Sequence, residues 1–396
     1  MTSGGATINP APPSSPPVEP SPPSQPIPTW IIAGLILMYE AAELDLLRTL
    51  ADIVNRHVDP HDVHQRITLT ATLQARVNFI VQQLQRQVSE QLPSTMADAV
   101  NWGDRIGYNE VRQVLGDRRA RITTPDPGLA DRAARDAIDQ LRLMHLTVRQ
   151  VVNNAAQQMH EHAAIESAVS DLHLHDAKQR LLERYARSGA TGFVDRRGRR
   201  WDLSTYAEMK IRTSATNAAV DAHLARISSS GIGLVHVSDS PRECELCRPW
   251  ENKILSVSGS VGTYTVPSVL TGEPVRVEVA GSIARARLAG LFHPNCTHFI
   301  TPYMPGATKL SKAVQDPQGY ADAQKLRALE RRVRQAKRVE AVALTPAMKT
   351  KARDEVRHWQ TEVRAHARAT DQLRRIVRER PEPPARARRE LSRGSS

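Results

Sequence analysis

Apolar residues recur at helical spacing over most of the chain. From residue 29 they return every three or four positions, which is the period of an amphipathic helix. The apolar face of this first run consists of Trp30, Ile31, Leu35, Met38, Ala42, Leu46 and Leu50. Pro60 is expected to end the helix, because proline lacks the backbone N–H that a helix interior requires.

Further helical runs follow. Residues 61–92 and 95–115 repeat the pattern, and Pro93 and Ser94 between them predict a break and the N-cap of a new helix. Neighbouring amphipathic helices of this length most simply pack as a hairpin. Residues 129–187 predict one long helix, or two with a joint near Asp171.

The apolar period then shortens to two, as in β-strands. Residues 191–203 predict a β-hairpin around a glycine-containing turn, and a helix is expected over 205–227. Alternation at 234–237 predicts another strand. Residues 263–266 and 275–279 predict a two-stranded ribbon, because a Thr-Gly-Glu turn lies between them.

Helices return in the C-terminal third. A short helix is expected over 284–289, and longer ones over 324–338 and 346–378. The heptads are too few for a coiled coil, so the last two helices are expected to form an antiparallel hairpin or to pack on a partner.

These elements predict a mainly helical α+β protein. Aromatic residues make up only 4% of the chain, so the core must come largely from aliphatic side chains, which favours helices over β-sandwiches. The expected organisation is a disordered Pro-rich tail at 1–28, a helical domain at 29–188, an α+β domain at 189–306, a basic helical region at 307–380 and a disordered basic tail at 381–396.

Charge indicates a polyanionic environment. The chain has 54 Lys and Arg against 42 Asp and Glu, a formal net charge of +12. Such a surplus favours nonspecific contact with nucleic acid, although solvated basic helix faces are the commoner cause. The candidate contacts to DNA or an acidic partner are Arg196, Arg197, Arg199, Arg200, Arg331, Arg332, Arg334, Lys337 and Arg338.

Hydropathy argues against a membrane protein. The longest apolar run, residues 30–38, is far shorter than the roughly 20 residues that cross a bilayer. No basic segment of the kind found in signal peptides precedes it. We therefore expect a soluble protein made in a reducing cytoplasm.

All three cysteines lie between residues 238 and 306, in two short arms. The first arm is Cys244-x-x-Cys247 and the second is His293-x-x-Cys296. Four soft or borderline ligands in two arms are what a tetrahedral Zn²⁺ requires. His298 competes with His293 for the fourth position.

Other interpretations of the cysteines remain open. The first pair could be a redox dithiol, the three thiols could form one disulfide with Cys296 free, or all could be buried and inert. A catalytic metal keeps an open coordination position, whereas four protein ligands favour a closed structural site. Asp239 beside the site is a supporting residue, and Trp250 and Phe292 are expected to cover it as apolar lids.

This block also carries a family resemblance. Residues 238–256, with Cys244-Glu-Leu-Cys247 followed by Arg-Pro-Trp, resemble a tailed-bacteriophage minor capsid protein, as do His293-Pro-Asn-Cys296 and the Thr-Pro-Tyr-Met-Pro-Gly segment at 301–306. The chain is similar to the minor capsid protein 2 family and, more distantly, to the phage Mu F-like head-morphogenesis proteins. Those proteins often end the second arm in Cys-Arg-Cys, whereas this chain has Cys296-Thr-His298.

The resemblance implies a structural virion protein without enzymatic activity. It would dock at the portal, the major capsid protein or the scaffold, near packaged DNA, in a virion head assembled in the host cytoplasm. The 189–306 region would correspond to the Mu F-like domain. The alternative, from a different class, is a metal-dependent nuclease or other nucleic-acid-processing enzyme using His298 and Asp239 beside the metal.

Overall fold

The computed structural model describes residues 27–56, 62–116, 126, 128–167, 171–188, 193–194, 200–240, 243–259, 261–294, 296–310 and 316–370. The predicted disordered tails at 1–28 and 381–396 lie outside the described residues, apart from positions 27 and 28. The described part is mainly helical with a five-stranded mixed sheet and a two-stranded hairpin, so the predicted α+β class is confirmed.

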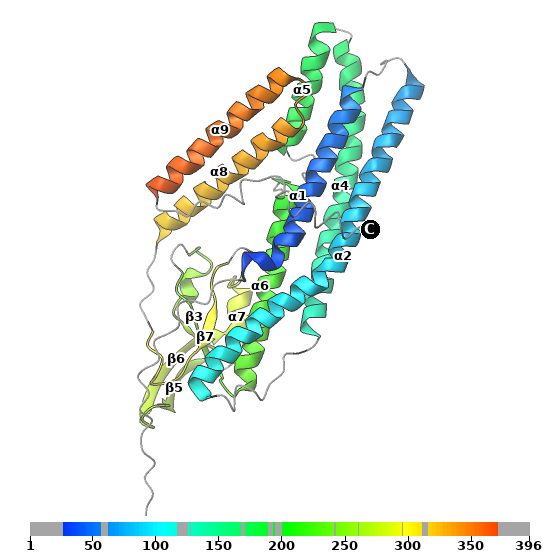
Figure 1. The fold of residues 1–396 in the computed structure, drawn as a ribbon. Coiled ribbons are helices and arrows are strands. Elements are labelled where there is room, and N and C mark those ends of the chain that lie inside the picture. The colour runs from blue at the N-terminus through cyan, green and yellow to red at the C-terminus, as the bar shows by residue number, and fades with distance from the viewer. Residues whose placement is uncertain are drawn as a thin grey trace, which may run out of the picture.

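A bundle of long helices forms the larger part of the molecule (Figure 1). It consists of α1 (Thr29–Asn55), α2 (Val63–Leu115), α4 (Leu129–Ser167), α5 (Asp171–Ser188) and α6 (Leu203–Ser229). Helix α2 is central, because it packs against α1, α4 and α6. The bundle core is aliphatic, as the low aromatic content predicts. The division of 129–187 into α4 and α5 confirms the predicted joint near Asp171.

Helix α2 corrects one prediction, because it continues through Pro93 instead of ending there. The residues on either side explain why. Leu92 and Met96 are fully buried in the bundle core on either side of Pro93, and a continuous helix keeps both on the buried face. This packing outweighs the roughly 3 kcal/mol that an interior proline costs. The hydroxyls of Ser94 and Thr95 both donate to the carbonyl of Gln91.

The second structural unit is a five-stranded sheet. Its strands are β3 (Leu234–Val237), β4 (Ile254–Ser256), β5 (Gly262–Pro267), β6 (Pro274–Ser282) and β7 (Ile300–Pro302), in the order β5-β6-β4-β3-β7. The predicted ribbon is confirmed as the antiparallel pair of β5 and β6. Strand β6 continues beyond the ribbon and pairs in parallel with β4. The predicted short helix is α7 (Ile283–Leu288).

Two smaller predictions are also confirmed. Strands β1 (Phe193–Val194) and β2 (Arg200–Trp201) pair antiparallel, as the hairpin prediction required. The helix expected after them is α6.

The sheet and the bundle share a hydrophobic core. Val111 of α2 and Val220 and Ile227 of α6 belong to the same buried cluster as Val235 of β3 and Phe299 just before β7. The segments that carry the cysteines are therefore supported from behind by two long helices. This packing holds the two arms of the cysteine block in place.

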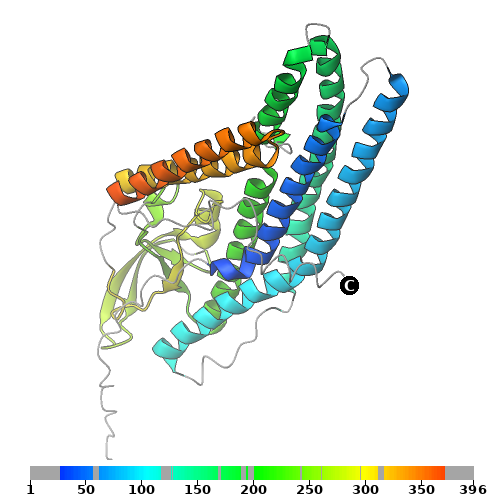
Figure 2. The same cartoon turned by 45° about the horizontal axis from the view of Figure 1, so that its top comes forward.

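The C-terminal helices α8 (Pro317–Ala341) and α9 (Pro346–Ala369) form a hairpin, as one of the two predicted arrangements required. Figure 2 shows this hairpin projecting from the bundle, and Figure 1 shows that α8 lies nearer to the bundle than α9. Arg187 of α5 donates both of its terminal nitrogens to Glu355 of α9, at 2.6 Å each. None of the described helices is long and apolar enough to cross a bilayer.

Candidate metal centre

The first cysteine arm is a tight turn. The backbone N–H groups of Cys247 and Arg248 both donate to the carbonyl of Cys244, at 3.1 and 3.0 Å. A 3₁₀ turn, η1 (Arg248–Trp250), follows directly, with Pro249 in its first turn. Because the chain folds back within three residues, the side chains of Cys244 and Cys247 point to the same side.

The second arm is a similar turn on the opposite side of the site. It begins at Gly290 and Phe292, whose φ angles of 110° and 62° lie in the left-handed region. This reversal brings the chain back after α7. The N–H of Cys296 then donates to the carbonyl of His293 at 2.9 Å, which places both side chains toward the first arm.

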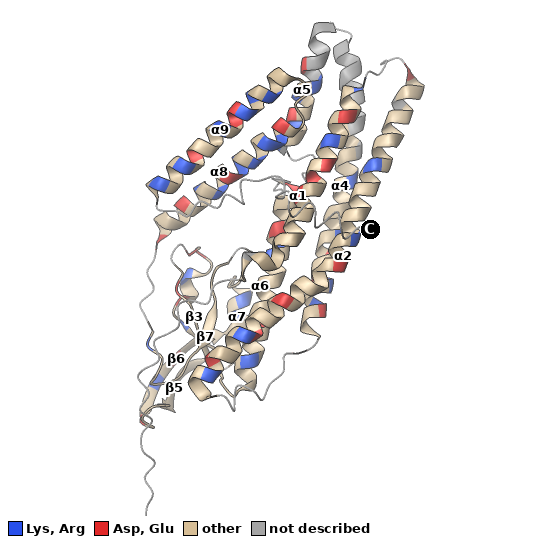
Figure 3. Ribbon diagram, in the orientation of Figure 1, with Lys and Arg blue, Asp and Glu red and all other residues tan. Residues whose placement is uncertain are grey.

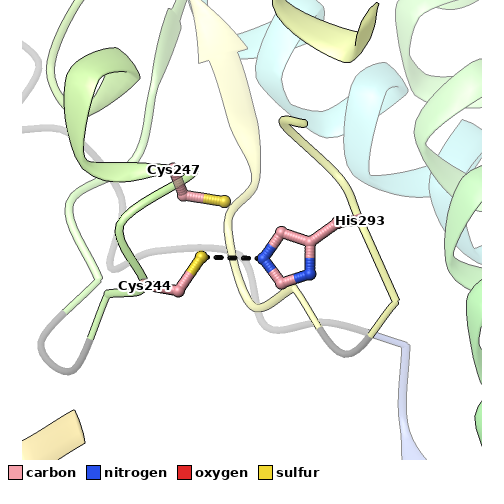
Figure 4. A group of neighbouring side chains, drawn as sticks. All are labelled: Cys244, Cys247 and His293. Atoms are coloured by element: carbon pink, nitrogen blue, oxygen red, sulfur yellow. Dashed lines mark hydrogen bonds between the residues drawn. The ribbon is translucent and has the colours of Figure 1, made fainter. Parts of the chain in front are cut away.

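The donor atoms of the two arms converge. Sγ of Cys244 lies 2.8 Å from Nε2 of His293, and Sγ of Cys247 lies 3.5 Å from Sγ of Cys296. Figure 4 shows both sulfurs of the first arm and the ring of His293 around one space. A tetrahedral Zn²⁺ with Zn–S bonds of about 2.3 Å holds two sulfurs ~3.8 Å apart. The separation of Cys247 and Cys296 is close to that value.

His298 lies at the back of the site and is almost completely buried. Its Nδ1 is 3.4 Å from Sγ of Cys296, and its backbone N–H donates to the same sulfur. Its Nε2 is 2.7 Å from Oε1 of the buried Glu251. Cys247, Cys296 and His298 therefore form a second group of converging donors, which shares Cys247 with the group of Cys244, Cys247 and His293.

The protonation of these groups follows from their contacts. The hydrogen bond between Cys247 and Cys296 raises the pKa of the Cys247 thiol and lowers that of Cys296, and burial adds to the rise at Cys247. Burial acts to lower the pKa of His298, but Cys296 and Glu251 outweigh it and the pKa is raised. The lowered pKa of Cys296 and the raised pKa of His298 together favour a thiolate at Cys296 beside a protonated His298.

Each of the two groups of three donors is compatible with a soft-metal ion such as Zn²⁺. Nδ1 of His293 lies 2.8 Å from the carbonyl oxygen of Pro294, and because a carbonyl can only accept, Nδ1 carries the proton. Nε2 of His293 therefore presents its lone pair toward the cysteines. Metal-binding histidines are commonly oriented in this way.

The two predicted lids lie at the site. Phe292 is buried and Trp250 is half-buried, and both belong to the cluster that contains Cys244, Cys247 and Cys296. The guanidinium of Arg287 stacks on the ring of Phe292 at 5.6 Å.

The predicted supporting residue Asp239 is half-buried, between two serines that tie the arms together. The N–H of Ser240 donates to Glu251, and its hydroxyl contacts that of Thr297. The hydroxyl of Ser238 accepts from the N–H of Phe299.

Two glutamates of the site were not predicted from the sequence. Glu251 orients His298, and the buried Glu243 accepts from Arg248 Nε at 2.9 Å and from the N–H of Asp316. Both lie within four residues of a cysteine, which is the only sequence signal that marks them. Burial of Glu243 would otherwise raise its pKa, but these hydrogen bonds outweigh it and the pKa is lowered.

The comparison with protein families agrees with the cysteine block. The family profile described as phage minor capsid protein 2 matches residues 29–368. The chain belongs to the phage minor capsid protein 2 family. No curated protein and no solved structure matches it. The match confirms the resemblance drawn from residues 238–306 and extends it over the bundle and the C-terminal hairpin.

As a phage minor capsid protein, the chain has a structural role in the virion. Its predicted DNA-contacting residues are distributed unevenly. Arg331 and Arg332 of α8 are exposed, whereas Arg334 and Lys337 are half-buried. The remaining predictions, Arg196, Arg197, Arg199 and the side chain of Arg200, lie outside the described residues.

Arg338 requires a correction. It is only 3% exposed, so it does not lie on a surface that DNA could reach. Its Nε donates to the carbonyl of Ala186, and its terminal nitrogens lie 3.2 Å from Asp202 and 4.0 Å from Glu43. Arg338 therefore joins α8 to the bundle.

Proposed function

We propose that this minor capsid protein is a structural component of the phage head, docked at the portal or on the inner capsid surface among portal, major capsid or scaffold proteins. In this proposal the cysteine block is a rigid module closed by a structural Zn²⁺. Cys244, Cys247, His293 and Cys296 would hold the ion, and His298 and Glu251 would support Cys296 from behind.

The observation that carries the proposal is that soft donor atoms from two separate turns lie next to one another. Cys244 and Cys247 come from one turn and His293 and Cys296 from another, and together they supply four donors. A catalytic zinc usually has three protein ligands and one open position. A set of four protein donors therefore favours a structural crosslink between the two loops over a reaction centre. The bound ion would supply rigidity, because each ligand bond crosslinks the two arms.

We assign His298 a supporting role and not the fourth ligand position, for which it competes with His293. Its Nε2–H is directed to Glu251, and both its Nδ1 and its backbone N–H approach Cys296. N–H groups directed at a ligating sulfur stabilise the thiolate and fix its orientation.

Two measurements test this proposal. The first is mass spectrometry and cryo-EM of the purified particles, in which we expect the chain at a low copy number at the portal vertex or inside the head. The second is incubation of the purified full-length chain with duplex DNA, with and without added Zn²⁺, Mg²⁺ or Mn²⁺. Metal-dependent cutting that Cys244→Ser abolishes would contradict the structural role and favour the nuclease alternative.

A further inference from the structure

Helix α9 presents a long outer face. Its buried side, which packs mainly on α8, consists of Ala352, Val356, Val363, His366 and Ala367. Figure 1 shows α9 on the side of α8 that is turned away from the bundle. Positions on the opposite surface of the helix, among them Arg357, His358 and Arg368, are exposed.

Cations follow one side of that outer face. Lys349, Arg353, Arg357, Arg364 and Arg368 are spaced by four, four, seven and four residues. At 100° per residue these positions fall within an arc of about 100°, and at 1.5 Å per residue they span roughly 29 Å. All are exposed except the half-buried Arg364. Figure 3 shows the basic segments recurring along α9.

The five cations from Lys349 to Arg368 form a basic stripe, and internal ion pairs involve only part of it. Arg353 lies 2.8 Å from Glu340 of α8, and Arg357 pairs with Asp354. Exposed pairs of this kind contribute about 0–1 kcal/mol, so an external anion can replace them. Within the described residues, no ion pair involves the remaining three cations of the stripe. The other acids of α9, Glu355 and Glu362, lie outside the arc.

We propose that this stripe contacts the phosphate backbone of duplex DNA, an inference that rests on the proposed location inside the phage head. Duplex DNA carries one negative charge per about 1.7 Å of its axis, so a row of cations ~29 Å long lies near phosphates of both strands. Between Lys349 and Arg368 the other accessible residues of the arc are Thr350 and Gln360, which are polar. A protein partner would need a buried apolar or aromatic anchor, and this arc offers none.

The contact would be independent of DNA sequence. A helix that lies along the DNA backbone with flexible Lys and Arg side chains binds the phosphates through their charge, which is the same for every sequence. Recognition of bases requires side chains that enter a groove. The residues differ from the cations predicted on α8, so the two helices can be tested separately.

The test compares two triple variants of the full-length chain. The stripe variant is Lys349→Gln, Arg357→Gln and Arg368→Gln. The matched control is Arg86→Gln, Arg105→Gln and Arg142→Gln, which removes the same charge from exposed positions of α2 and α4. Fluorescence anisotropy with two unrelated duplexes of about 30 base pairs, between about 50 and 200 mM salt, measures affinity and its salt dependence. Circular dichroism checks that both variants are folded.

The slope of log K against log salt is negative, and we expect its magnitude to decrease by about three in the stripe variant, equally for both duplexes. In the control the slope should change little. Equal loss in both variants would overturn the inference, because net charge alone would then explain binding. Absence of DNA binding by the wild-type chain would also overturn it. Detection of the stripe variant in particles tests the proposed location separately. If the variant binds DNA normally but is missing from particles, the stripe contacts a protein instead.

Discussion

His293 and His298 lie on either side of Cys296, yet their surroundings give them different roles. His293 directs Nδ1–H to a backbone carbonyl and Nε2 toward Cys244. His298 is held between Glu251 and the sulfur of Cys296. The spacing of the motif alone left both as candidates, because the difference comes from Glu251 and from the chain reversal at Phe292.

This difference predicts how the two histidines respond to mutation. His293→Ala should reduce bound zinc from about one ion per chain to well below that, because one of four ligands is lost. His298→Gln should keep the ion but weaken its affinity by about 10–100-fold, as loss of a supporting hydrogen bond does. Elemental analysis after gel filtration gives the stoichiometry, and competition with a chelator gives the affinity. The assignment is wrong if His298→Gln loses the ion and His293→Ala keeps it.

Arg338 allows a second test at the scale of single residues. It lies beside Glu43, whose pKa is raised by burial, and Arg338 offsets only part of that rise. Arg338→Ala would leave buried carboxylates without their cation, which should cost ~3–5 kcal/mol in the free energy of unfolding. The exposed Lys325→Ala on the same helix should change it by less than about 0.5 kcal/mol. Denaturant unfolding measures both, and similar values for the two variants would show that Arg338 does not join α8 to the bundle.

Among the elements, α2 shows best what local sequence can and cannot predict. The helical period of 61–115 predicted its face correctly, but Pro93 and Ser94 wrongly predicted a break, because tertiary burial of Leu92 and Met96 outweighs the local signal. The sequence did not predict strands β4 and β7, for a different reason. Each has only three residues, which is too short for a period of two to be recognised. Pairing with distant strands defines them.

The packing of α2 on α6 depends on a glycine. A Cβ at Gly103 would lie 1.9 Å from the backbone oxygen of Ala219, so Gly103→Ala must push the two helices apart. We expect a loss of about 1–3 kcal/mol or more, despite the better helix propensity of alanine.

Gly34 in α1 is the matched control. A Cβ there meets only the end of the flexible Gln91 side chain, so Gly34→Ala should be neutral or stabilising. Thermal unfolding of the two variants measures the contrast. Equal effects would indicate that α2 and α6 are not in close contact at Gly103.

At the scale of the whole molecule, the bundle and the sheet depend on different interactions. The bundle has a large aliphatic core, whereas the loops around the cysteines have few apolar residues of their own and share the cluster with α2 and α6. Helical periodicity predicted the helices of the first unit, and two-residue alternation predicted β3, β5 and β6 of the second. The sequence could not predict that they share a core, because Val111 and Phe299 are far apart in the chain.

Removal of the metal should therefore loosen the loops around the cysteines and leave the helical bundle largely unchanged. With a strong chelator, we expect amide hydrogen exchange to accelerate in residues 243–259 and 290–303, where the ion would crosslink the two arms. Exchange in α1, α2 and α4 should change little, because aliphatic burial stabilises these helices without metal. Cys244→Ser without chelator should reproduce the pattern, and zinc added back to the wild-type chain should reverse it. Uniform acceleration over the bundle would mean that the ion stabilises the whole fold, and an unchanged pattern would mean that the four donors hold no ion.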